Sequence, residues 1–266
     1  MTDAALRPIS LDLRDHVAVV TGAAQGIGRG CALMLAAHGA VVIVADRNGD
    51  LAAEVAAEAT AAGYRAEGMA LDVADESQVA AAFAGITLRH GRVSALVNAA
   101  GVISPNVSAE EAEGADFDRV IAVNLKGTML CGKHAARQMI GRGGGRIVNI
   151  ASQAALLSLP HQSVYTASKG GVVALTRSQA IDWAEHGINV NCICPTFIRT
   201  PMAQPMLDDP AVMRAVRKRI PLGRVGEPED IGAVALFLIS EMSSLMTGQI
   251  LAVDGGWSAG EPGLDL

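Results

Sequence analysis

The sequence predicts a single α/β domain, doubly wound, with a parallel seven-stranded sheet and helices on both faces. Apolar runs of strand length alternate with helical stretches along the 266 residues. The apolar runs are nearly continuous, as expected for strands that helices cover on both faces. No Ser/Gly-rich or charged linker divides the chain. We therefore expect one domain that spans residues 1–266.

Seven segments have the length and composition of buried strands. Because strands that alternate with helices are joined by crossover connections, we expect them to run parallel. The predicted strands are 16–21, 40–45, 66–71, 93–98, 146–150, 188–193 and 249–253.

Six helices are expected between and after these strands. Several are followed by a glycine that can take positive φ and close the last turn, and Glu227–Pro228 places proline in the first turn of the last helix. The predicted helices are 26–38, 50–62, 76–90, 117–140, 164–185 and 228–240.

Residues 195–226 form the one irregular region. This segment holds five prolines around a short helix that carries Met and Arg. It is longer than an ordinary connection, which predicts a substrate-binding lid over the site. The alternative is a surface segment that only packs on the sheet.

Composition favours an enzyme that acts on a small molecule. The net charge is -6 without a basic stripe, which argues against nucleic acid or an anionic membrane as the main partner. No apolar run approaches the roughly 18 residues of a spanning helix. Residues 1–15 lack the apolar core of a signal peptide, so we expect a cytoplasmic protein.

The four cysteines do not predict a metal site or a disulfide framework, because neither the spacing nor the density fits. Cys192 and Cys194 are two residues apart in a predicted strand, so both lie on one buried face. We interpret all four as reduced core thiols. A redox pair is the alternative for Cys192 and Cys194.

A glycine-rich loop joins the first strand to the first helix, over Thr21–Gly28. Gly22 permits a tight turn, Gly26 lets a pyrophosphate approach the backbone, and Gly28 allows close packing of the helix. The helix N-terminus adds free N–H groups and positive potential. The loop predicts a dinucleotide site that includes Gln25 and Ile27. A plain strand-to-helix turn is the alternative.

The second strand ends at Asp46. A carboxylate there accepts hydrogen bonds from both hydroxyls of an adenosine ribose and repels a 2′-phosphate. This residue favours NAD over NADP. Arg47, which could pair with a phosphate or stack on adenine, supports the opposite preference.

Tyr165 and Lys169 are candidates for proton transfer. They are one turn apart on a helix, so their side chains share a face. A free tyrosine has a pKa of about 10, and a nearby ammonium stabilises the phenolate. Ser152 follows the fifth strand, at the sheet edge where open α/β sheets place ligands. Asn124 is a polar residue in an apolar helix, where irregularities often accompany function.

Together, the loop Thr21–Gly28 and the series Asn124, Ser152, Tyr165 and Lys169 resemble the short-chain dehydrogenase/reductase family over about residues 14–257. The resemblance implies a Rossmann domain that binds NAD. It implies that Tyr165 is the acid/base and that Ser152 orients the substrate oxygen. Lys169 would bind the nicotinamide ribose and lower the Tyr165 pKa, and Asn124 would hold a water of the proton relay.

The resemblance also implies further cofactor contacts and an assembly. Asp72 and Val73 would contact adenine, and a turn over Asn98–Gly101 would lie beside the adenosine. The residues expected near the nicotinamide are Pro195, Ile198 and Thr200. The family resemblance and the apolar helices near 117–140 and 164–185 predict a homotetramer with three perpendicular two-fold axes.

The sequence constrains the substrate-binding residues less than the cofactor-binding residues. Thr196 stands where the family usually has glycine, which either narrows the pocket, adds a polar contact or is simply tolerated. His161 is a candidate substrate contact and the alternative acid/base. The other expected substrate contacts are Gln153, Phe197 and Met202.

These residues predict an NAD(H)-dependent oxidoreductase that interconverts a small secondary alcohol, of polyol, sugar or sugar-acid type, and its ketone. A 3-oxoacyl thioester reductase is the alternative within enzymes, although Asp46 opposes the NADP that such a reductase usually uses. A non-catalytic dinucleotide-binding regulatory protein is the alternative from another class.

Overall fold

The computed structural model describes residues 10–260. The seven strands form one parallel sheet in the order β3-β2-β1-β4-β5-β6-β7, so the predicted doubly wound sheet is confirmed. The strands are β1 (Val17–Thr21), β2 (Val41–Asp46), β3 (Arg65–Ala70), β4 (Ala95–Asn98), β5 (Gly145–Ile150), β6 (Ile188–Pro195) and β7 (Ile250–Val253). The expected absence of a signal peptide concerns residues 1–15, and most of these, residues 1–9, lie outside the described residues.

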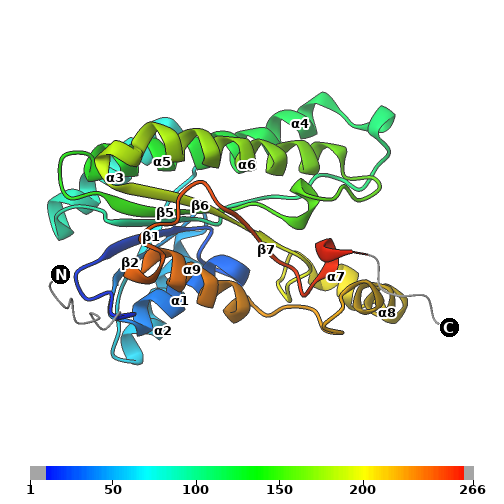
Figure 1. The fold of residues 1–266 in the computed structure, drawn as a ribbon, viewed down its shortest axis with the longest axis horizontal. Coiled ribbons are helices and arrows are strands. Elements are labelled where there is room, and N and C mark those ends of the chain that lie inside the picture. The colour runs from blue at the N-terminus through cyan, green and yellow to red at the C-terminus, as the bar shows by residue number, and fades with distance from the viewer. Residues whose placement is uncertain (1–9, 261–266) are drawn as a thin grey trace, which may run out of the picture.

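Helices cover both faces of the sheet (Figure 1). One layer contains α1 (Gly26–Ala37), α2 (Gly49–Ala61) and α9 (Pro228–Ile239). The other contains α3 (Glu76–His90), α4 (Gly114–Ile121), α5 (Thr128–Met139) and α6 (Ser163–Trp183). Two short helices, α7 (Gln204–Leu207) and α8 (Pro210–Arg219), lie beyond one end of the strands. In the part of the chain described, no helix is long and apolar enough to cross a membrane.

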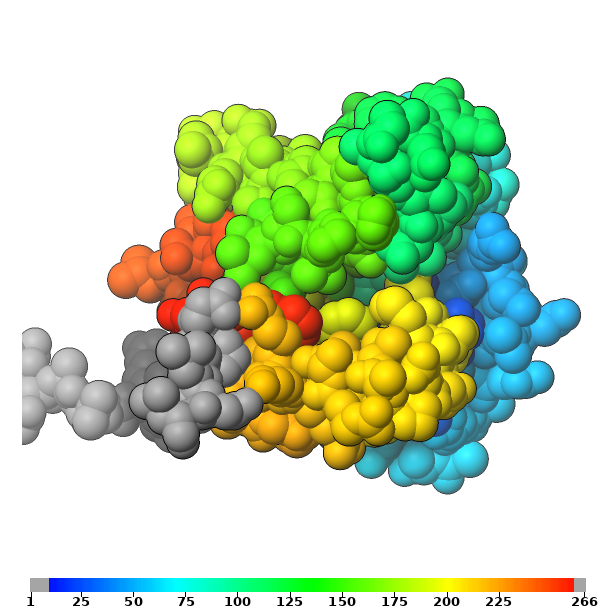
Figure 2. Space-filling model, turned by 90° about the vertical axis from the view of Figure 1, so that its right-hand side faces the viewer, coloured from blue at the N-terminus to red at the C-terminus, as the bar shows by residue number. Residues whose placement is uncertain are grey.

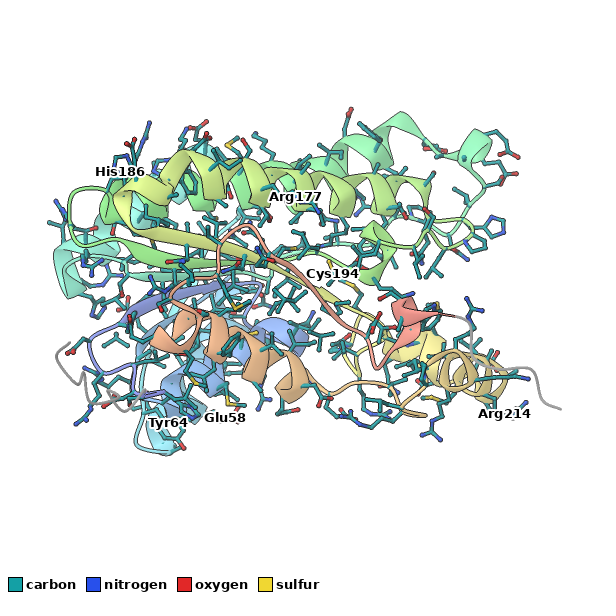
Figure 3. All side chains as sticks on the ribbon, viewed as in Figure 1. Glu58, Tyr64, Arg177, His186, Cys194 and Arg214 are labelled. Atoms are coloured by element: carbon teal, nitrogen blue, oxygen red, sulfur yellow. The ribbon has the colours of Figure 1, made fainter. Side chains whose placement is uncertain are left out.

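Two apolar cores lie between the sheet and the helix layers. Neighbouring residues of one strand enter different cores: Val20 packs with α1 and α9, whereas Val19 packs with α3 and α5. This explains why the strand sequences are apolar without alternation. Figure 3 shows side chains filling both spaces, with Cys194 at the sheet. Cys192 and Cys194 are buried free thiols in one cluster, as expected.

The helix ends follow the expected chemistry. Gly39, Gly63, Gly91 and Gly187 all have positive φ. Glu227 and Asp230 form a capping box at the start of α9. Gly30 is a further close-packed glycine of α1, where an added Cβ would lie 2.7 Å from the Cβ of Pro228 in α9. Gly30 therefore fixes α1 against α9.

The helix predicted over 117–140 starts earlier and is not regular. It consists of α4, a π-helical segment over Ala122–Gly127 and α5. Contacts from elsewhere in the fold hold the irregular turn. A Cβ on Gly127 would lie 2.6 Å from Cγ2 of Val73, and one on Gly171 of α6 would lie 2.7 Å from Cδ2 of Leu125. The expected irregularity at Asn124 is this π segment.

The segment 195–226, here called the lid segment, contains two helices where one was expected. A bridge between Ile198 and Gly226 closes its base. Its apolar side chains form a small core with Trp257, whose ring stacks on Phe197 at 5.7 Å. In Figure 2 the lid segment, in yellow, lies opposite the green surface of the upper helix layer.

Candidate active site

The β1–α1 loop has no room for side chains at two of its glycines. Gly22 has a φ of 65°, and a Cβ there would lie 2.6 Å from the Cα of Ala100. A Cβ on Gly28 would lie 2.1 Å from the carbonyl oxygen of Gly22. Gly28 therefore packs the first turn of α1 onto the loop itself. This compact loop leaves the helix N-terminus open toward the cavity.

A cavity of about 500 Å³ lies in front of this N-terminus. No side chain caps α1, so its first N–H groups are available to a phosphate. The volume is within the roughly 300–1,000 Å³ of pockets for cofactors and similar ligands. The predicted cofactor residues that line it are Gly22, Gln25, Gly26, Ile27, Gly28, Asp46, Asp72, Val73, Gly101, Tyr165, Lys169 and Thr200. These residues fit a dinucleotide.

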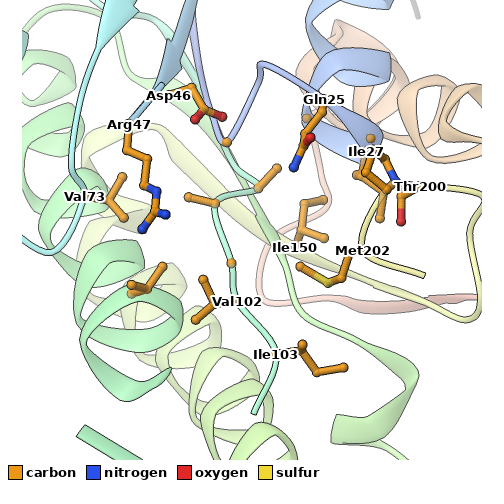
Figure 4. Close-up of a pocket in the computed structure, with 18 of the residues that line it drawn as sticks. Gln25, Ile27, Asp46, Arg47, Val73, Val102, Ile103, Ile150, Thr200 and Met202 are labelled. Atoms are coloured by element: carbon orange, nitrogen blue, oxygen red, sulfur yellow. The ribbon is translucent and has the colours of Figure 1, made fainter. Parts of the chain in front are cut away.

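Asp46 and Arg47 lie together at one end of this cavity, and Thr200 lies at the other (Figure 4). The Asp46 carboxylate accepts hydrogen bonds from the backbone N–H groups of Ala24, at 3.2 Å, and Asn48, at 3.0 Å. These bonds hold the carboxylate beside the glycine-rich loop. Arg47 is exposed and reaches into the same end.

The turn after β4 is braced from β1. The hydroxyl of Thr21 accepts hydrogen bonds from the N–H groups of Ala99 and Ala100, both at 3.2 Å. Asn98 is not among the residues that line the cavity, so its expected cofactor contact stays a prediction. Its side chain points into the core, where Nδ2 donates to Oδ1 of Asn149 at 2.9 Å. Asn98 thus braces the central sheet.

Tyr165, Lys169 and Ser152 come together at the sheet edge. The Lys169 Nζ lies 5.8 Å from the centroid of the Tyr165 ring and donates to the carbonyl of Ile150 at 2.9 Å. The Ser152 side chain lines the smaller of two cavities together with Tyr165 and accepts a hydrogen bond from the N–H of Ala154 at 3.1 Å. Tyr165 and Lys169, one helical turn apart on α6, therefore lie near Ser152 at the end of β5, as expected.

The pKa shifts of Tyr165 and Lys169 differ from expectation. Burial raises the pKa of Tyr165, and the hydrogen bond with Ser152 opposes this effect only in part. Burial lowers the pKa of Lys169 to about 8. The expected lowering of the Tyr165 pKa by Lys169 is not found in this structure, because Nζ is directed at the carbonyl of Ile150 and burial disfavours the phenolate.

Asn124 is fully buried in the π segment. Its carboxamide accepts from the N–H of Val102 at 2.8 Å and donates to the Val102 carbonyl at 2.9 Å. Nδ2 also donates to the hydroxyl of Ser168 at 3.0 Å, which donates to the carbonyl of Tyr165 at 2.7 Å. The Asn124 side chain thus ties the loop after β4 to the turn that carries Tyr165. That it holds a water stays a prediction.

A second cavity of about 140 Å³ opens beside the first. Tyr165 lines both cavities, as do Thr200 and Met202. Pro195 and Ile198, expected at the cofactor, line only this smaller cavity. The exposed His161 lines neither cavity and has a φ of 61°. The other predicted residues of the smaller cavity are Ser152, Gln153, Thr196 and Phe197.

Comparison with known proteins identifies the family. A family model described as "Enoyl-(Acyl carrier protein) reductase" matches residues 22–258. The cis-4-hydroxycyclohexanecarboxylate dehydrogenase of Sinomonas cyclohexanicum is 40% identical over 92% of this chain and 97% of its own. The D-threitol dehydrogenase of Mycolicibacterium smegmatis is 39% identical over 97% and 99%. The chain belongs to the short-chain dehydrogenase/reductase family.

Two further members of the short-chain dehydrogenase/reductase family differ in cofactor. The NAD-dependent glycerol dehydrogenase of Listeria innocua is 38% identical over 93% of this chain and 95% of its own. A crystal structure of gluconate 5-dehydrogenase from Burkholderia cenocepacia J2315, in complex with NADP and tartrate, superposes with a TM-score of 0.90 at 36% identity. It covers 94% of this chain and 98% of its own. Like these relatives, the chain is an oxidoreductase.

Several site residues of this short-chain dehydrogenase/reductase were not predicted. Ser168 links Asn124 to Tyr165, and its position directly before Lys169 was the available signal. Val102 and Ile103 continue the turn after β4 into the larger cavity. Across the described chain, no group of three or more His, Cys, Asp or Glu residues lies close enough together to hold a metal ion.

Proposed function

We propose that the chain is an NAD-dependent oxidoreductase that interconverts a small secondary alcohol, of polyol, sugar or sugar-acid type, and its ketone. One observation carries this proposal: Tyr165 lines both cavities, and Ser152 lines the smaller cavity with it. A phenol between a dinucleotide-sized cavity and a small cavity is placed to exchange a proton with a substrate oxygen while the adjacent carbon faces the cofactor side.

Each side chain has a proposed part. Bound NAD supplies the hydride acceptor and, when oxidised, a positive charge beside the phenol. Tyr165 would take the hydroxyl proton of the alcohol as a phenolate, which the positive charge of oxidised NAD stabilises, and as the phenol would return the proton in reduction. The Ser152 hydroxyl orients the substrate oxygen, and the Lys169 ammonium binds the nicotinamide ribose. Asn124 holds the loop after β4 and, through Ser168, the backbone of Tyr165.

The preference for NAD rests on Asp46. Its carboxylate is held at the end of β2 by two backbone N–H groups, so it cannot easily move away from a 2′-phosphate. Arg47 lies beside it and favours the opposite choice. Relatives of both kinds exist, one named NAD-dependent and one solved with NADP. We propose that the fixed anion dominates.

Fluorescence titration of NADH and NADPH tests this preference. NADH should bind at least about tenfold more tightly, a difference of about 1.4 kcal/mol, because Asp46 repels the phosphate. Asp46→Ala should reduce the ratio, since the repulsion disappears although no phosphate site is created. Arg47→Ala is the matched control and should leave NADH preferred. Equal affinities of the wild-type protein for the two cofactors would contradict the proposal.

A 3-oxoacyl thioester reductase is the second candidate. A 3-oxoacyl-[acyl-carrier-protein] reductase of Thermotoga maritima, 36% identical over 92% of this chain and 98% of its own, favours it. The same titration separates the two functions, because preference for NADPH would favour the thioester reductase.

We also propose a homotetramer that works in the cytoplasm. Four buried free thiols suit a reducing compartment. Apolar side chains exposed on the helix layer of α4 and α6, among them Phe117 and Ile181, suit an interface between subunits.

A further inference from the structure

We propose that the substrate is an uncharged vicinal diol, or the matching hydroxyketone, whose second hydroxyl is bound by Gln153 and Thr196. This inference rests on the proposed function and narrows its substrate class. It excludes sugar acids, although the gluconate dehydrogenase and the hydroxycyclohexanecarboxylate dehydrogenase among the relatives are named for carboxylates.

The smaller cavity carries no charged side chain. None of the residues that line it is Asp, Glu, Lys, Arg or His. Arg199, next in sequence to a lining residue, points to Glu227 and donates to its carboxylate at 3.1 Å. Taking a carboxylate out of water without a counter-charge costs several kcal/mol. A neutral substrate avoids this cost.

Two polar atoms at this cavity lack a protein partner. In residues 10–260, six buried side-chain nitrogen or oxygen atoms have no hydrogen-bond partner. Only Nε2 of Gln153 and Oγ1 of Thr196 belong to residues that line either cavity, and both line the smaller one. Gln153 is 2% exposed, so its side chain is shielded from bulk solvent. A buried donor without a partner is destabilising, and a substrate hydroxyl would supply the missing partner.

The positions of Gln153 and Thr196 suit a hydroxyl on the carbon next to the reacting one. They follow the adjacent parallel strands β5 and β6, which remain paired through the bond from the N–H of Ala151 to the carbonyl of Ile193 at 2.8 Å. Gln153 directly follows Ser152, which lines the smaller cavity together with Tyr165. A ligand whose reacting oxygen meets Ser152 and Tyr165 therefore presents its neighbouring hydroxyl to Gln153 and Thr196.

The remaining wall limits the size of the substrate. It is apolar, with Leu159, Phe197 and Met206 among its side chains. The volume of about 140 Å³ is well below that of a pocket for a drug-sized ligand, at about 300–1,000 Å³. A short diol with a small carbon skeleton suits this space better than a long acyl chain.

Steady-state oxidation of four probes with saturating NAD tests the inference. The probes are D-threitol, 2,3-butanediol, 2-butanol, which lacks the second hydroxyl, and 2,3-dihydroxybutyrate, which adds a carboxylate. At least one neutral diol should exceed both 2-butanol and the acid by at least about tenfold in kcat/KM, because sites built to bind a hydroxyl discriminate against analogues that lack it.

Variants connect that preference to the two residues. Gln153→Leu and Thr196→Val should each reduce the ratio of diol to 2-butanol by about fivefold or more, whereas a merely structural effect would lower both rates together. Gln249→Leu, at an exposed glutamine, is the matched control and should keep the wild-type ratio.

The outcomes separate the two proposals. If 2-butanol or the acid is oxidised as efficiently as the diols, or if both variants keep the wild-type ratio, the diol inference is wrong and the oxidoreductase proposal stands. If none of the four probes is oxidised, the diol inference and the proposed alcohol class both fail.

Discussion

At the scale of single residues, Tyr165 and Lys169, the proposed catalytic pair, lie in an environment that favours neutral groups. Lys169 is 5% exposed, and burial lowers its pKa to about 8. Burial raises the pKa of Tyr165. The spacing of four residues predicted that both side chains share a face, but it could not predict these pKa directions. They depend on how α6 packs on β5 and β6.

Replacing Lys169 by methionine should stabilise the unliganded protein near pH 7. The pKa falls from 10.5 unfolded to about 8 folded, so the folded chain binds fewer protons between these values and its stability rises with pH there. The destabilisation by the ammonium is full below pH 8 and is lost above about 10.5. Its upper limit is roughly 3 kcal/mol.

Urea unfolding at pH 7 and pH 10 measures this effect. Lys169→Met should gain up to about 2 kcal/mol at pH 7, after loss of the hydrogen bond to Ile150, and much less at pH 10. The same variant should bind NADH more weakly, since its ammonium is proposed to bind the ribose. If Lys169→Met were instead less stable than wild type, by the same amount at pH 7 and at pH 10, burial of the ammonium would have no such cost.

At the scale of elements, local signals predicted more of the cofactor side than of the substrate side. The β1–α1 loop is one continuous segment, so its glycines could be interpreted from the sequence. Asn124 followed by Gly127 predicted a helix irregularity, but not a π segment, because the contacts that hold it come from Val102, Ser168 and Gly171.

The loops after β5 and β6 show why the substrate side resisted prediction. Gln162 lines the smaller cavity, whereas its neighbour His161 does not. Pro195 and Ile198 line the smaller cavity and not the larger one, because the chain turns into the lid segment at this point. Which side chain of a loop faces a cavity depends on its backbone turns, and no periodicity in the sequence records them.

At the scale of the whole molecule, the alternation of strands and helices was sufficient to predict the parallel doubly wound sheet, since crossovers of one hand leave few arrangements. Assembly is different, because an exposed apolar side chain does not by itself identify its partner. On the outer helix layer, Ile181 of α6 is 80% exposed and Phe117 of α4 is 45% exposed.

Light scattering at micromolar concentration tests the proposed tetramer. We expect a mass four times that of the chain. Ile181→Glu should shift the mass to smaller species, because a carboxylate would be buried at the interface. Leu88→Glu, at a similarly exposed position on α3, is the control and should leave the mass unchanged. A wild-type monomer would contradict the proposal.

The most direct test of the central claim is the turnover of Tyr165→Phe with NAD and an alcohol that the wild-type protein oxidises. The variant lacks only the phenol oxygen, so its affinity for NADH should stay close to wild type. General acid–base groups contribute about 10²–10⁴-fold, and we expect a loss of that size or more in the rate of hydride transfer. If the variant kept more than about a tenth of wild-type activity, Tyr165 would not be the acid/base.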